Sequence, residues 1–109
     1  MTLNKEQILA QKLKLLKVEV PEWGGAVYVR ELSAKEQDEI ADVVRKGQTL
    51  SNAKLAAMVL CDENGIPLFT DKDIPQLEQV SGNVLGKILT ASAKLSGADE
   101  NTIQELQKN

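Results

Sequence analysis

The chain has 109 residues, a length that suits one domain with a single modest core. Its 42% hydrophobic and 27% charged residues are ordinary globular values, which exclude wholesale disorder, and its net charge of −3 lacks the basic excess of a nucleic-acid-binding protein. One Trp, one Tyr and one Phe are the only aromatic residues, so we expect an aliphatic core and mainly helical packing.

The residue types that carry most enzyme chemistry are missing. The chain has no histidine, the residue that most often serves as general base, nucleophile partner or zinc ligand. It also has no glycine-rich loop of the kind that holds phosphate groups. We therefore expect no catalysis, no cofactor and no metal.

The single cysteine, Cys61, lies in an apolar run and is expected to be a small buried hydrophobic residue. No apolar stretch is long enough to span a bilayer, and the first residues do not resemble a signal peptide. These features predict an intracellular protein without a membrane partner.

Residues 4–14 are predicted to form the first helix. Asn4 and Gln7 have the spacing of a capping box. The apolar side chains that follow at helical intervals are Ile8, Leu9 and Leu13.

Residues 17–31 are predicted to form a β-hairpin, because valines alternate with other residues on both sides of a turn. Pro21 ends the first strand since it lacks a backbone N–H, and Gly24 and Gly25 can take the positive φ of a tight reversal. The valines expected to face the helices are Val18, Val20, Val27 and Val29. The side chains expected to face outward are Lys17, Glu19, Tyr28 and Arg30.

After the hairpin, Ser33 and Glu36 have the spacing of a second capping box, which opens a helix that ends near Gly47. Ser51 or Asn52 is expected to cap the next helix. Its apolar run, which predicts a central buried helix, includes Leu55, Ala56, Met58, Val59 and Leu60.

The last third of the chain begins with a predicted turn at residues 62–65 and a short extended piece at 66–69. Thr70 and Asp73 have the spacing of a third capping box, which starts a short helix through residues 74–80. Ser81 begins a further helix that ends at residues 96–97. The tail from residue 98 has only Ile103 and Leu106 as apolar anchors.

Taken together, these elements predict an α+β, mainly α fold. Residues 1–97 would form a single helical domain, with four to five short helices packed around one N-terminal hairpin at 17–31. Residues 98–109 would form a weakly ordered or helical tail.

Three side chains are candidates for binding a partner. Trp23 lies at the hairpin tip, where it either folds back onto the helices or stays out as an interface residue. Tyr28 and Arg30 lie on the outward strand face, where they either contact a partner or form cross-strand pairs with Lys17 or Glu19.

Charge is distributed unevenly along the chain. Residues 1–20 contain four lysines and two acidic residues, whereas residues 62–78 contain five acidic residues and one lysine. Opposed charges of this kind favour head-to-tail association into rings or spirals, although such runs are more often solvated faces.

Residues 18–33 have the sequence VEVPEWGGAVYVRELS, which resembles the start of tail assembly chaperones from long-tailed bacteriophages of the siphophage type. Members of that family begin with a short helix, continue through a valine-rich hairpin with a Trp-Gly turn, and enter a helix at a Leu-Ser cap. Residues 62–73 resemble the family's acidic turn, short extended piece and helix start, and residues 93–97 its closing segment.

The resemblance implies a non-catalytic protein of the infected or lysogenic bacterial cytoplasm. Such a protein binds and solubilises the tape measure protein, helps recruit the tail tube protein, and is absent from the mature virion. Many members also have a longer form made by ribosomal frameshifting. Two other protein-binding functions remain open, which are a minor structural or scaffold component of the tail and a cytoplasmic adaptor. An enzyme is the least favoured alternative.

Overall fold

The computed structural model describes residues 1–97, and the predicted tail at 98–109 lies outside the described residues. The helices are α1 (Lys5–Leu9), α2 (Ala34–Arg45), α3 (Asn52–Val59), α4 (Ile74–Leu77) and α5 (Gly82–Leu95), with 3₁₀ turns η1 (Pro21–Trp23) and η2 (Asp71–Asp73). The strands are β1 (Leu15–Val20), β2 (Gly25–Arg30) and β3 (Leu60–Cys61). The mainly α, α+β class predicted from the sequence is confirmed.

The predicted hairpin is formed by β1 and β2, which pair antiparallel with Val18 opposite Val27. Gly24 reverses the chain with a φ of 73°, a left-handed conformation that glycine adopts without steric cost. The sheet has a third strand that the sequence analysis did not predict, because β3 pairs with β2 at residues 60–61. Pro67 adds an isolated bridge to Cys61, so the predicted extended piece lies at the edge next to β3.

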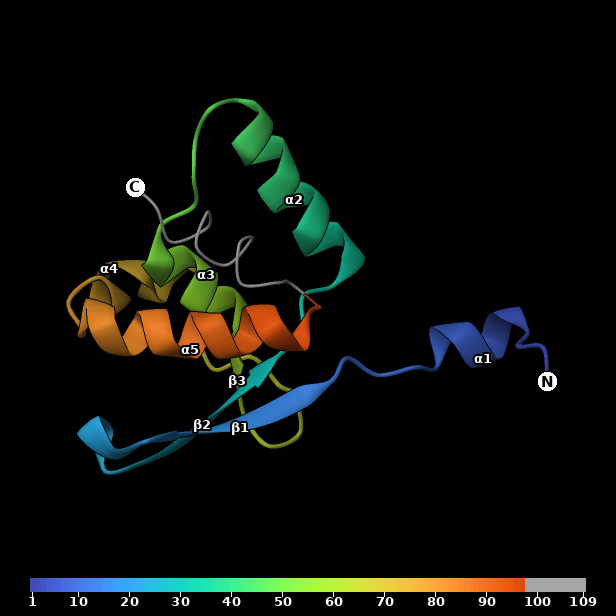
Figure 1. Cartoon of the computed structure of the whole chain (residues 1–109), viewed down its shortest axis with the longest axis horizontal. Helices are drawn as coiled ribbons and strands as arrows, with labels where there is room; N and C mark the ends of the chain where they lie inside the picture. The colour runs from blue at the N-terminus through green and yellow to red at the C-terminus, as the bar shows by residue number, and fades with distance from the viewer. Residues whose placement is uncertain (98–109) are drawn as a thin grey trace.

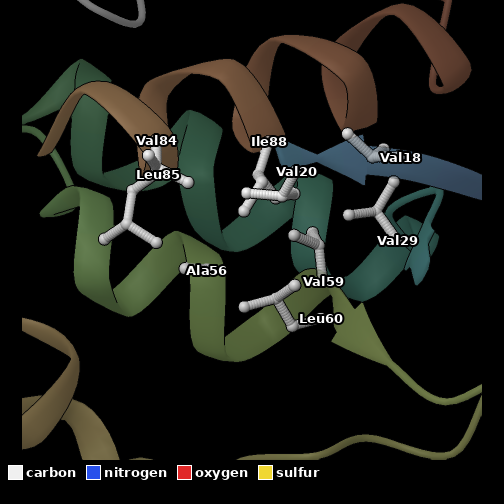
Figure 2. Packing of buried hydrophobic residues seen from close by; sticks show 9 residues of the cluster. All are labelled: Val18, Val20, Val29, Ala56, Val59, Leu60, Val84, Leu85 and Ile88. Atoms are coloured by element: carbon white, nitrogen blue, oxygen red, sulfur yellow. The ribbon is translucent and has the colours of Figure 1, made fainter. Parts of the chain in front are cut away.

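Helices α3 and α5 cover one face of this sheet (Figure 1). Between them lies the main core, whose buried members among the described residues are all aliphatic (Figure 2). These are Val18, Val20, Val29, Ala56, Val59, Leu60, Val84, Leu85 and Ile88. The inward direction predicted for three of the hairpin valines is thus confirmed, and Val27 is partly buried against the same cluster.

Side-chain caps fix where the helices begin. Asn4 and Ser33 each form the predicted capping box, in which the cap side chain accepts a hydrogen bond from the third helical residue and that residue's side chain accepts one from the cap backbone. Ser51, rather than Asn52, caps α3, and Ser81 caps α5. The predicted ends of α2 and α5 are confirmed by the left-handed Gly47 and Gly97.

Three predicted helices are shorter than expected. α1 ends at Leu9 instead of continuing to residue 14, because Lys14 already exchanges hydrogen bonds with Glu31 at the open end of the hairpin. α3 ends one residue early, since Leu60 turns extended to pair in the sheet. α4 ends at Leu77, and Val80 lies beyond it.

Two helices stand apart from the packed sheet and its covering helices (Figure 1). α1 lies beyond the open end of the hairpin and has no buried residue. α2 also has no buried residue, and it rises from the end of β2. In the part of the chain that the structure describes, no helix is long and apolar enough to cross a membrane.

Candidate protein-binding site

An apolar hollow of about 240 Å³ opens beside the hairpin tip, and we call it the Trp23 hollow. It is formed by seven side chains that come from η1, β2, β3, the extended piece at 66–69, the end of α4 and the residues after it. They are Trp23, Val27, Leu60, Leu68, Phe69, Leu77 and Val80. A lining of this kind has no side-chain group that can transfer a proton, but it can bury an apolar side chain of a partner.

The local sequence explains why Trp23 reaches the hollow. Pro21 starts the 3₁₀ turn, and its carbonyl oxygen accepts a hydrogen bond of 3.0 Å from the N–H of Gly24. Glu22 pairs with Lys87 of α5 at 3.7 Å, which ties the tip to the covering helix. Trp23 remains 44% exposed, so its ring is partly packed and partly open to solvent.

Several residues of the hollow keep much of their surface in contact with solvent. Leu68 and Val80 are 53% and 37% exposed, and together with Trp23 they form an apolar patch. A patch of this kind, gathered around a concave surface, is typical of protein-binding sites. The volume is below the range of about 300–1,000 Å³ that small-molecule sites usually occupy.

The other two candidates lie away from the hollow. Tyr28 and Arg30 point to the opposite face of the sheet from Val27 and Val29, because side chains alternate along a strand. In the register of the sheet, Tyr28 lies opposite Lys17 on one side and Cys61 on the other, so Lys17 rather than Glu19 is its cross-strand neighbour. The three sequence candidates therefore do not form one site.

Arg30 is held within the chain by Glu36 of α2. Its two terminal nitrogens donate hydrogen bonds of 2.7 and 2.6 Å to the two carboxylate oxygens, and its Nη1 also donates to the carbonyl of Glu31. The side chains of Arg30 and Glu36 are only 12% and 16% exposed. This bidentate ion pair anchors the base of α2 to the end of β2.

The pKa values of the pair follow from this geometry. The hydrogen bond to Glu36 raises the pKa of Arg30 above its usual value, against the opposing effect of burial. Burial alone would raise the pKa of Glu36, but hydrogen bonds from Arg30 and from the Ser33 amide outweigh it and lower the pKa. Both groups are therefore charged at neutral pH.

A second exposed apolar surface lies at the other end of the molecule, on residues 1–14, which we call the arm. Its exposed hydrophobic side chains are Met1, Leu3, Ile8, Leu9 and Leu13. Ile8, Leu9 and Leu13 were predicted from the sequence as a helical stripe, but not as an exposed surface. The sequence did contain a signal for this surface, because an apolar stripe on a terminal helix needs a packing partner.

Known proteins resemble this chain in both sequence and fold. The family model described as phage tail assembly chaperone matches residues 5–109, which is most of the chain. The chain belongs to the phage tail assembly chaperone family. The resemblance to chaperones of long-tailed phages found in the sequence is thereby confirmed.

The chaperone is also similar to a solved structure, that of the tail assembly chaperone of bacteriophage HK97. The two chains are 26% identical and superpose with a TM-score of 0.64. The match covers 87% of this chaperone and 95% of the HK97 chain. No curated protein sequence is significantly similar to this chaperone.

Proposed function

We propose that this chaperone acts without catalysis in the cytoplasm of the bacterial host, where it binds and solubilises the tape measure protein and helps recruit tail tube subunits. The single observation that carries the proposal is the exposed, wholly apolar Trp23 hollow. The family membership supports the same role, since the description tail assembly chaperone implies partners among the phage tail proteins.

The hollow suits a helical client because of its shape and chemistry. A tape measure protein is a long helical chain with apolar stripes, and such stripes aggregate unless they are covered. One or two apolar side chains of a stripe would fill the hollow, in the way that amphipathic helices bind apolar grooves. Burial of one such side chain contributes about 1.5–3 kcal/mol.

Trp23 is the residue that we expect to contribute most to client binding, because a rigid, half-exposed aromatic side chain gains contact area at little entropic cost. Tyr28 stays in the proposal as a second contact, on the outer face of the sheet. Arg30 also stays in the proposal, but only indirectly. Its guanidinium is already bound by Glu36, so it holds α2 in place and does not contact the client itself.

Co-expression with the tape measure protein tests this function. The chaperone should shift the tape measure protein from the insoluble to the soluble fraction, and Trp23→Ala should reduce that shift. The matched control is Val44→Ala, which truncates an apolar side chain that is 51% exposed on α2, away from the hollow. A client that stays insoluble with the unaltered chaperone would contradict the proposal.

The proposed location has its own test. A chaperone that leaves the tail before completion should be found with the tape measure protein in infected-cell extracts and should be missing from purified virions by mass spectrometry. Its recovery from virions at a fixed copy number would favour a structural component of the tail instead.

The proposal includes self-association into rings or spirals. It is supported by the excess of lysine at residues 1–20 and of acidic residues at 62–78, which lets the two regions of neighbouring copies attract each other.

A further inference from the structure

The molecule has an apolar projection at one end and an apolar hollow at the other. The arm leaves the open end of the hairpin, whereas the Trp23 hollow lies beside the hairpin tip (Figure 1). Strand β1 separates them by six residues, or about 20 Å at the usual rise per residue. Because the arm points away from the tip, it does not reach the hollow of its own chain.

The arm has the features of a segment that binds another surface. Ile8 and Leu9 are 56% and 74% exposed, although they belong to a helix with a complete capping box. A helix of five residues gains little from its own hydrogen bonds, so its stability depends on packing. No described residue buries its apolar side chains.

Charge identifies the surface that fits the arm. The arm carries Lys5, Lys12 and Lys14 against the single acid Glu6. The elements around the hollow carry two carboxylates, which are Glu22 in η1, at 3.7 Å from Lys87, and Glu78 directly after α4. An arm that enters the hollow would bring its lysines toward these carboxylates.

We propose that the arm of one copy occupies the Trp23 hollow of a second copy and is displaced from it by the client. This inference rests on the proposed function in one respect, which is that the hollow is the client site. The contact is head-to-tail, so the free arm and free hollow at the two ends of a pair bind further copies. The arm thereby covers an aggregation-prone surface until an apolar helix of the tape measure protein competes for it.

Two variants separate the halves of this contact. Ile8→Glu combined with Leu9→Glu changes only the arm, and Leu68→Glu changes only the hollow, at side chains that are exposed. Far-UV circular dichroism establishes that each remains folded. In sedimentation velocity, the unaltered chaperone should form concentration-dependent oligomers and each variant alone should stay monomeric. Val44→Glu, at an exposed apolar side chain of α2, should assemble like the unaltered chain.

Mixing the two variants is the decisive experiment. The intact arm of the Leu68→Glu chain fits the intact hollow of the arm variant, so the mixture should form a one-to-one dimer that grows no further. Monomers in the mixture, or full assembly by the arm variant alone, would overturn the proposal.

Trp23 provides a direct readout, because it is the only tryptophan of the chain. A synthetic peptide of residues 1–14, which contains no tryptophan, is titrated into the full-length arm variant. The emission of Trp23 should shift to shorter wavelength and saturate, and the peptide with both glutamates should bind about tenfold more weakly or worse. An unchanged Trp23 spectrum at saturating peptide would count against occupation of the hollow.

The client then separates this inference from the proposed function. Added tape measure segment should release bound arm peptide, and the arm variant should still solubilise the tape measure protein. If the client is solubilised but arm peptide is neither bound nor released, the arm contact is wrong and the chaperone function stands. If arm peptide binds but no chaperone variant solubilises the client, the chaperone function is wrong.

Discussion

Replacement of Glu36 by glutamine tests how the base of α2 is held. The glutamine keeps a side-chain oxygen that can accept the 2.9 Å hydrogen bond from the Ser33 amide, so the capping box survives. It removes the negative charge that faces both terminal nitrogens of Arg30 at 2.6–2.7 Å. The change therefore isolates the ion pair from the helix cap.

The expected loss follows from the burial of the pair. A charge-assisted hydrogen bond is worth about 1.5–3 kcal/mol, and the substitution leaves a largely buried guanidinium with only neutral acceptors, the glutamine oxygen and the carbonyl of Glu31. We expect the free energy of unfolding to fall by about 2 kcal/mol. For a domain of this size, the melting temperature should fall by about 10 °C.

The pH dependence gives the prediction a second part. Because the pKa of Glu36 is lower in the folded than in the unfolded chain, the pair stabilises the fold fully above the unfolded value of 4.5. This stabilisation is lost as the pH falls through the folded pKa. The difference in unfolding free energy between the unaltered chain and Glu36→Gln should therefore be largest at neutral pH and shrink in acid.

Urea unfolding followed by far-UV circular dichroism, at neutral pH and at about pH 3, measures both parts. Glu39→Gln is the matched control, because it removes an exposed carboxylate from the same helix. Equal stability of Glu36→Gln and the unaltered chain at neutral pH would refute the reasoning. So would a difference that stays constant down to the lower pH.

Four further substitutions test other features of the fold, each by the same urea unfolding measurement. Ser92→Ala removes the 3.0 Å hydrogen bond that the buried hydroxyl donates to the carbonyl of Arg30, and it should cost about 1–3 kcal/mol; no loss would mean that the carbonyl finds another donor. Gly65→Ala should destabilise the fold by about 1 kcal/mol, because Gly65 has a φ of 83°. Gly86→Ala within α5 should stabilise it by about the same amount, since alanine favours a helix and the added Cβ meets no atom within 4 Å. Stabilisation by the first change or destabilisation by the second would contradict these reasons. Ile88→Ala leaves a cavity at the fully buried centre of the core and should lower the free energy of unfolding by about 3 kcal/mol. If this loss is smaller than the loss caused by Ile88→Val, the core collapses around the cavity instead.

Local signals in the sequence predicted most of the fold. Capping spacings at Asn4 and Ser33 marked two helix starts, because a capping box involves residues only three apart. The hairpin was equally accessible, since Gly24 and the alternating valines define both the turn and the inward face.

The errors arose where distant contacts decide the local structure. Leu60 and Cys61 continue an apolar run that fits a buried helix, and only their pairing with β2 makes them a strand. The end of α1 was misplaced for the same reason, because Lys14 is drawn into the hairpin by Glu31, seventeen residues away. No periodicity within either segment contains this information.

The candidate site was only partly accessible from the sequence. Trp23 was singled out, but the choice between packing and exposure required Leu68 and Val80, which approach from far along the chain. Arg30 was predicted on the strand face away from the valines, but its partner on α2, which covers it, became visible only when β2 and α2 were placed together.

Cys61 makes this chaperone suitable for thiol chemistry. It is the only cysteine, it is 1% exposed between Tyr28 and Pro67 in the sheet, and burial raises the pKa of its thiol, so little thiolate is available to reagents. A cysteine introduced on the surface would therefore take up a fluorophore or cross-linker selectively without removal of the natural one. The rate at which Cys61 itself is alkylated would report how often the sheet opens to expose it.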